Sequence, residues 1–223
     1  MNNEFIWLGL LGLGGAHGLN PAMGWLFAVG IGLQQRDRRA VWRALGPLAL
    51  GHALSIAVVV LLAAAVELVL PVQQLEWLIA AALIGSGVFH LARHRHPRYG
   101  GMRMSAKELT IWSFLMATAH GAGLMALPLV LDIAPPLQSH HAPGGLLATS
   151  HTEHMLAAGM DAAQALGFAA TLLHTLGYLA VTALLAVIVY EKLGLRVLRR
   201  AWINLNLIWA IALIVTGLLT PLL

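Results

Sequence analysis

Six long apolar stretches run through this chain, and short polar segments separate most of them. The stretches cover residues 4–33, 47–70, 73–92, 109–133, 164–190 and 202–221. Each is long enough to cross a bilayer, whose hydrocarbon core of roughly 30 Å takes about 20 residues of α-helix. Because lipid offers the backbone no hydrogen bonds, spanning segments of this kind are helical. The pattern therefore predicts an all-α polytopic membrane protein, with six transmembrane helices forming one domain over residues 1–223.

Basic residues mark one side of the membrane. All 13 Lys and Arg residues fall within three short segments, 36–43, 93–107 and 192–200. Short loops rich in Lys and Arg stay cytoplasmic, so both termini are expected outside, in a bacterial inner membrane. The first three spans then run opposite to the last three, which is the topology of two inverted three-helix repeats. We assign the repeats to residues 4–92 and 109–221.

Composition narrows the classes of function. Hydrophobic residues make up 59% of the chain and charged residues only 10%, whereas soluble domains carry about 25% charged residues. The net charge of +4 comes from the cytoplasmic loops, and it therefore reports topology and not a nucleic-acid partner. The chain contains no cysteine, which excludes disulfides and thiolate metal sites.

Two short histidine motifs occur once in each proposed repeat, and in the same order. Ala-His-Gly stands at 16–18 and 119–121, in the first and fourth spans. His-Ala-Leu-Ser at 52–55 in the second span matches His-Thr-Leu-Gly at 174–177 in the fifth. Chance similarity among helices rich in Ala, Gly and Leu is the alternative explanation.

The motifs place four histidines inside predicted spans: His17, His52, His120 and His174. Ionisable residues at membrane depth are costly, and they usually face a cavity or a partner. Neutral imidazole is also a common ligand of transition metals. We hypothesise that the four histidines form one metal site near the membrane midplane. The alternative is four separate interhelical hydrogen bonds, each worth about 1 kcal/mol or less.

The first span is expected to break between Gly14 and Pro21. Glycines crowd this stretch, and proline removes a backbone donor and clashes with the preceding turn. Broken helices near the midplane are typical of transporter binding sites. Asn20 and Met23 lie beside the expected break and are possible additional ligands.

Residues 17–24, His-Gly-Leu-Asn-Pro-Ala-Met-Gly, resemble the first-helix pattern His-x-Leu-acid-Pro-Gly-His-Gly of the efflux-type nickel/cobalt permeases. His-Ala-Leu-Ser at 52–55 resembles the pattern on the next helix of that family. These permeases belong to the lysine-exporter superfamily, so the resemblance implies paired three-helix units. Asn20 replaces the family's acid and Met23 its second histidine. The donor set is therefore softer, and nickel, cobalt, copper, zinc and iron all stay open.

The connection over 134–163 is predicted to be an extracytoplasmic loop, because prolines and glycines cluster in it. It contains His140, His141, His151 and His154. The permeases that the chain resembles often carry a His-rich loop, which implies a metal-collecting role; a solvated polar loop is the alternative. At the cytoplasmic boundary, His90, His94 and His96 flank arginines, and we interpret them as a solvated face.

These features predict a permease for a divalent or soft transition-metal ion rather than an enzyme. The chain has no nucleotide-binding loop, so transport would draw on an ion gradient or on a partner subunit, and a homo-oligomer is also compatible. The expected partners are membrane lipid and the metal ion. Two other functions stay open: a membrane-embedded redox enzyme with His-ligated metal or haem, and an exporter of a small organic solute.

Overall fold

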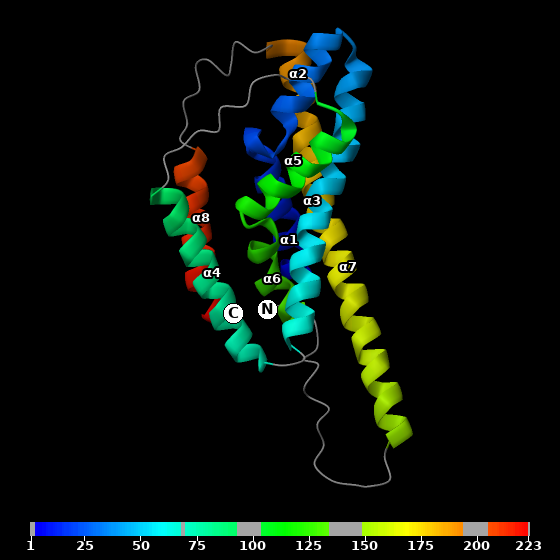
Figure 1. Ribbon diagram of the computed structural model, residues 1–223, viewed down its shortest axis with the longest axis vertical. Coiled ribbons are helices and arrows are strands. Elements are labelled where there is room, and N and C mark those ends of the chain that lie inside the picture. The colour runs from blue at the N-terminus through cyan, green and yellow to red at the C-terminus, as the bar shows by residue number, and fades with distance from the viewer. Residues whose placement is uncertain (1–2, 68–69, 93–103, 134–148, 194–204, 223) are drawn as a thin grey trace.

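The computed structural model describes residues 3–67, 70–92, 104–133, 149–193 and 205–222, and within these ranges it contains helices and no strand (Figure 1). For 149–163 only the backbone is described. The α-helices are α1 (Asn3–Leu19), α2 (Trp25–Gln35), α3 (Arg38–Glu67), α4 (Val72–Ala92), α5 (Ala106–Ala119), α6 (Ala122–Ile133), α7 (Thr149–Ile188) and α8 (Leu205–Leu219). Short 3-10 turns lie at η1 (Pro21–Met23) and η5 (Thr220–Leu222), and a π-helical turn, η3 (Val189–Leu193), follows α7.

The chain has the helices of an integral membrane protein, as the apolar pattern predicts. Among the described residues, α3, α4 and α7 are each long and apolar enough to cross a membrane. The pair α5 and α6, bent by 65° at its junction, would make a fourth span. Helix α8 is apolar but shorter over its described part.

The distribution of polarity is the reverse of that in a soluble protein. The large apolar side chains of Leu61, Leu62 and Phe168 are 60–67% exposed, whereas His17 and His174 are completely buried. A surface of this kind is unfavourable in water and suits hydrocarbon. The outer faces of the helices are therefore the lipid-facing surface.

Helix boundaries agree with the predicted stretches except at the start of α3 and around the long connection. Helix α3 begins at Arg38 and not at 47, so most of the basic segment 36–43 is helical. The loop predicted over 134–163 is wrong in its second half, because α7 begins at Thr149 and continues unbroken to Ile188. Residues 149–163 are rich in Ala, Met and Leu, which are good helix formers. Once the following span nucleates a helix, such residues extend it at little cost.

The first predicted span is interrupted at the C-terminal edge of the stretch where a break was expected. Helix α1 ends at Leu19, and the Asn20 side-chain oxygen caps η1 by accepting from the Ala22 N–H (3.0 Å). Pro21 opens η1, where its missing donor is not needed. Gly24 then adopts φ 134°, which side-chain-bearing residues rarely reach, and α2 begins.

The fourth predicted span is also interrupted, directly after its Ala-His pair. His120 ends α5, Gly121 adopts φ 68°, and α6 leaves at an angle of 65°. Helix α5 starts with a capping box, in which Ser105 and Glu108 satisfy each other's backbone N–H groups.

The helices associate mainly in three pairs: α1 packs along α7, α3 along α5, and α4 along α8 (Figure 1). Helices α3 and α7 also pack against each other. Helices from the first half of the chain thus pair with helices from the second half.

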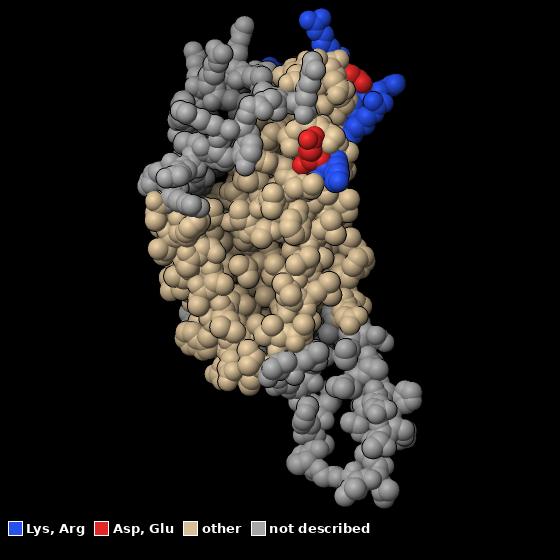
Figure 2. Space-filling view, in the orientation of Figure 1, with Lys and Arg blue, Asp and Glu red and all other residues tan. Residues whose placement is uncertain are grey.

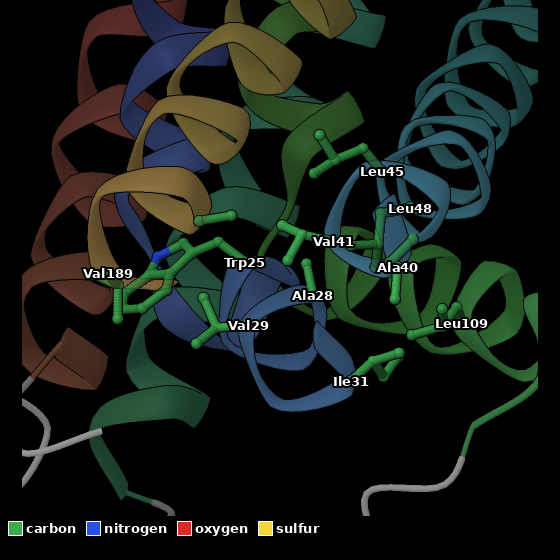
Figure 3. Close-up of a cluster of buried hydrophobic side chains, with 12 residues drawn as sticks. Trp25, Ala28, Val29, Ile31, Ala40, Val41, Leu45, Leu48, Leu109 and Val189 are labelled. Carbon is green, nitrogen blue, oxygen red and sulfur yellow. The ribbon is translucent and has the colours of Figure 1, made fainter. Parts of the chain in front are cut away.

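Basic side chains gather at one end of the molecule, as the face in Figure 2 shows. Arg36 and Arg38 lie where α2 meets α3, and Arg38 forms an ion pair with Glu191 of η3 (3.0 Å). Below this end, α2, α3, α5 and η3 share an apolar cluster (Figure 3). Its labelled members are Trp25, Ala28, Val29, Ile31, Ala40, Val41, Leu45, Leu48, Leu109 and Val189.

Candidate functional site

Three of the four intramembrane histidines meet in the interior. The ring centroids of His17 (α1), His52 (α3) and His174 (α7) lie 5.2–5.7 Å apart in all three pairs. All three side chains are fully buried. The site therefore combines one histidine from the first predicted span, one from the second and one from the fifth. We refer to it as the histidine triad.

Close contact between α1 and α7 brings His17 and His174 together. A methyl group on Gly14 would collide with the His174 carbonyl group, and one on Gly18 would lie 2.6 Å from the Tyr178 carbonyl oxygen. Small residues permit this approach, as they do at many membrane helix interfaces. The His17 ring is fixed further by its Nδ1, which is 2.9 Å from the Leu13 carbonyl oxygen.

The triad carries ring nitrogens that have no partner at hydrogen-bonding geometry within the described part of the chain. These atoms are Nε2 of His17 and both ring nitrogens of His52 and His174. A buried polar group without a partner costs about 1–3 kcal/mol, and native proteins contain few of them. Five such atoms around one point indicate a binding site more readily than a packing role.

Tyr178, one helical turn after His174, is a member of the site that sequence analysis missed. Its ring stacks on His52 with centroids 3.9 Å apart and an interplanar angle of 6°. Its buried hydroxyl donates to the Met23 carbonyl oxygen at 2.6 Å. The only sequence signal is its i+4 spacing from His174, which places both side chains on one face of α7.

His120 lies apart from the triad and pairs with His90 instead. The indole of Trp209 (α8) lies 4.6 Å from the His17 ring and 6.1 Å from the His120 ring, measured between centroids. His120 stacks on His90 at 5.6 Å, and its Nδ1 is 2.8 Å from the Met116 carbonyl oxygen.

His90 differs from the solvated residue that its neighbouring arginines predict. It is half-buried at the end of α4, and its Nε2 lies 2.7 Å from the Ala119 carbonyl oxygen, at the break in the fourth predicted span. This carbonyl is exposed by the bend, which explains why a donor from another helix is held there. His94 and His96 lie outside the described residues.

Asn20 and Met23, the further candidate ligands, are both buried beside the triad's helices. The Asn20 side-chain oxygen is engaged in capping η1, and the Met23 carbonyl is engaged by Tyr178. The histidines proposed for the outer loop are not placed. His140 and His141 lie outside the described residues, as do the side chains of His151 and His154 on α7.

The triad matches a metal site in spacing but not in ring orientation. Two imidazoles on one ion, each with a metal–nitrogen distance of about 2.0–2.1 Å, have centroids roughly 5–6 Å apart, as the triad does. Yet within the described part of the chain no group of three His, Asp or Glu side chains is arranged to hold a metal ion. His52 and His174 are nearly parallel (10°). The rings would have to turn before three nitrogens could meet one ion.

No protein-family model, curated protein or solved structure matches this chain. The nickel/cobalt permeases accordingly stay a resemblance, carried by residues 17–24 and 52–55. What the site does has to follow from the triad itself.

Proposed function

We propose that this chain is a membrane permease for a divalent or soft transition-metal ion, with the histidine triad as its binding site. One observation carries the proposal: three buried histidines from both halves of the chain meet with five unpartnered ring nitrogens. Neutral imidazole nitrogens are ligands that nickel, cobalt, copper, zinc and iron accept. Ionisable residues buried at membrane depth commonly line the path of a transported ion.

The proposed fold has six spans arranged as two inverted repeats. Exchanging the halves turns α1 into α5, α2 into α6, α3 into α7, and α4 into α8. Under this exchange the observed α1–α7 pair becomes the α3–α5 pair, and the α4–α8 pair becomes itself. Packing that is unchanged by the exchange is expected of inverted repeats related by a pseudo-twofold axis.

Residue contacts repeat under the same exchange. His52 and His174 occupy matching places, and they stack on each other. The Ser55 hydroxyl is hydrogen-bonded to the Thr118 hydroxyl at 2.9 Å. Gly177 matches Ser55 and Gly15 matches Thr118, and these two residues are also in contact, since a methyl on Gly177 would lie 3.1 Å from the Gly15 nitrogen. Such matched contacts favour an axis that passes between His52 and His174, at the centre of the triad.

The proposed orientation places the basic end in the cytoplasm and both termini outside a bacterial inner membrane. His120 lies beside the site, where Trp209 contacts both His120 and His17. The outer-loop histidines would collect the ion, and an ion gradient or a partner subunit would supply the energy. The softer donors near the site leave the choice of metal open among the five ions.

Metal content and binding of the purified protein test this function. Elemental analysis would be followed by calorimetric titration in nanodiscs with Ni²⁺, Co²⁺, Zn²⁺, Fe²⁺ and Cu⁺. We expect one of these ions to bind wild type and to accumulate in proteoliposomes. A variant with His17, His52 and His174 all changed to alanine should do neither, while His90→Ala serves as the matched control.

Two outcomes would replace this function with its rivals. An absorption band in the haem Soret region would assign the triad to a haem enzyme. A folded wild type that binds none of the five ions would favour the organic-solute exporter, in which the histidines carry protons.

Topology has its own test, which the lack of native cysteine simplifies. Cysteines at Lys107, at the basic end, and at Gln74, at the start of α4, should label from opposite sides of the membrane. Labelling of both from one side would contradict the inverted topology.

A further inference from the structure

The break in the first predicted span is held by three side-chain donors from three different helices. Each donor is aromatic and bonds one backbone carbonyl that the break leaves free. The bonds run from Trp25 Nε1 to Leu19 (3.2 Å), from Trp112 Nε1 to Ala22 (3.2 Å), and from the Tyr178 hydroxyl to Met23 (2.6 Å). Unsatisfied carbonyls at membrane depth are costly, so these bonds stabilise the break in its present form.

Tyr178 differs from the two tryptophans because its ring also belongs to the triad's packing. One face of the His52 ring lies against it at a centroid distance of 3.9 Å. Trp112 instead stacks edge-on against Phe27 of α2 at 5.0 Å. A shift of His52 therefore acts directly on the Tyr178 ring, whereas the Trp112 indole packs on Phe27.

The packing of α1 on α7 limits which parts of the structure can move when His52 shifts. Gly14 and Gly18 put the two backbones in close contact along the helix that carries Tyr178. Sliding α1 along α7 would disrupt this contact, because closely packed helices tolerate little relative movement. The bond between Tyr178 and Met23 joins α7 to η1, which follows the end of α1 and lies beyond the Gly14 and Gly18 contacts.

We propose that Tyr178 is a positioning residue that couples occupancy of the triad to the state of the break. This inference rests on the proposed metal site. Three nitrogens can meet one ion only if the rings turn, and turning His52 removes its face from Tyr178. Tyr178 then releases or re-aims its hydroxyl at Met23, and the η1–α2 segment is freed relative to α7. Binding at the triad thereby opens the break.

Hydrogen exchange in the segment 19–28 measures the state of the break, because several of its amides bond within it. We would compare wild type with Tyr178→Phe and Trp112→Phe, each of which loses one bond to the break and keeps an aromatic ring. Tyr190→Phe, on the same side of the molecule near Gly32, is the control. Each protein is measured with and without the ion from the titration set that binds wild type most tightly.

We expect the ion to raise exchange of this segment in wild type. Both Tyr178→Phe and Trp112→Phe should raise the ion-free rate, on the order of tenfold for one lost hydrogen bond. Only Tyr178→Phe should lose the further response to the ion at saturation, and by linkage it should bind the ion up to about tenfold more tightly, because binding no longer has to break the bond to Met23. Tyr190→Phe should behave as wild type.

A wild-type response to the ion in Tyr178→Phe would overturn the coupling and leave the metal site standing. Failure of all the ions to bind folded wild type would overturn both. If Tyr178→Phe does not fold, wild type labelled with 3-fluorotyrosine gives the same decision, because the chain has only three tyrosines. The Tyr178 resonance, assigned by elimination with Tyr99→Phe and Tyr190→Phe, should move on Zn²⁺ binding; an unmoved resonance at saturation would overturn the coupling.

Discussion

The two interrupted spans share the tripeptide Ala-His-Gly near the break, but the two histidines have different neighbours. At the first break, His17 lies within α1, three residues before the capping Asn20, and it faces α3 and α7. At the second, His120 is itself the cap of α5 and turns toward His90 on α4. Trp209 contacts both histidines from α8.

The difference between the breaks shows which features a local motif controls. Both Ala-His-Gly segments lead to an interruption, and both histidines place Nδ1 close to the carbonyl oxygen four residues earlier, at 2.9 and 2.8 Å. Their other partners differ because the helices that reach each break differ. The motif thus leads to an interruption of the helix and to the contact of Nδ1 with the preceding turn. Tertiary packing decides whether Nε2 of the histidine joins a site.

The largest difference between the two breaks is expected in the metal affinity of variants that lack the histidine of each break. Removal of any triad histidine, as in His17→Ala, is expected to weaken binding by about 100-fold or more, since even supporting residues around metals contribute roughly 10–100-fold. His120→Ala should change affinity far less than any triad substitution, because the His120 ring stacks on His90 and not on a triad histidine. Calorimetric titration of each variant measures both effects.

A double-mutant cycle sharpens this comparison. The pair His17→Ala and His52→Ala should be strongly non-additive, whereas His17→Ala and His120→Ala, which share the contact with Trp209, should show a much smaller coupling. Equally strong coupling in the two pairs would place His120 in the same site as the triad and remove the distinction between the breaks.

Helix packing beside the breaks should give the next largest effect. Gly14→Ala directs a methyl at the His174 carbonyl group of α7, and we expect a loss of about 3 kcal/mol of stability. Gly12→Ala, two residues away, meets nothing within 4 Å and is the matched control, expected to be neutral or slightly stabilising. At the matching place in α5, Ala117 already carries a buried methyl. Unfolding by SDS titration in mixed micelles measures the difference, and equal stability of the two variants would contradict the close α1–α7 contact.

The second break should depend on a single glycine. Gly121→Ala forces a side chain into φ 68°, which is expected to cost about 1–2 kcal/mol. Gly85→Ala, at a helical position with nothing within 4 Å, is the control and should cost nothing. The same SDS titration applies, and metal affinity should be unchanged in both variants. A loss of affinity in Gly121→Ala would show that the second break also shapes the triad.

Asn20 should give the smallest effect, and it distinguishes a cap from a ligand at the first break. Asn20→Ala removes the oxygen that accepts from Ala22 and should cost about 1 kcal/mol of stability. Asn20→Ser keeps a capping oxygen and should retain both stability and metal affinity. A loss of metal affinity in Asn20→Ser, with stability retained, would return Asn20 to the list of ligands.

Local sequence was sufficient to predict the membrane class and the interruption of the first span. Apolar stretches of about 20 residues and the loss of a donor at Pro21 act over a few neighbouring residues, so they can be read locally. The sequence also singled out the three triad histidines, because an ionisable residue in an apolar helix is costly wherever the helix packs. It misplaced the start of α7, since the cluster of prolines and glycines that predicted a loop lies at 135–145, and the helix-forming residues after it belong to α7.

Which of these residues meet depends on the tertiary packing of the helices. His120 carries the same motif as His17, yet its neighbours come from α4 and α8. Tyr178 shows no motif of its own, and it gains its place from the close α1–α7 contact and from the bond to Met23, 155 residues away. Contacts between separate helices depend on how whole helix faces fit together, a property that no short stretch of sequence carries.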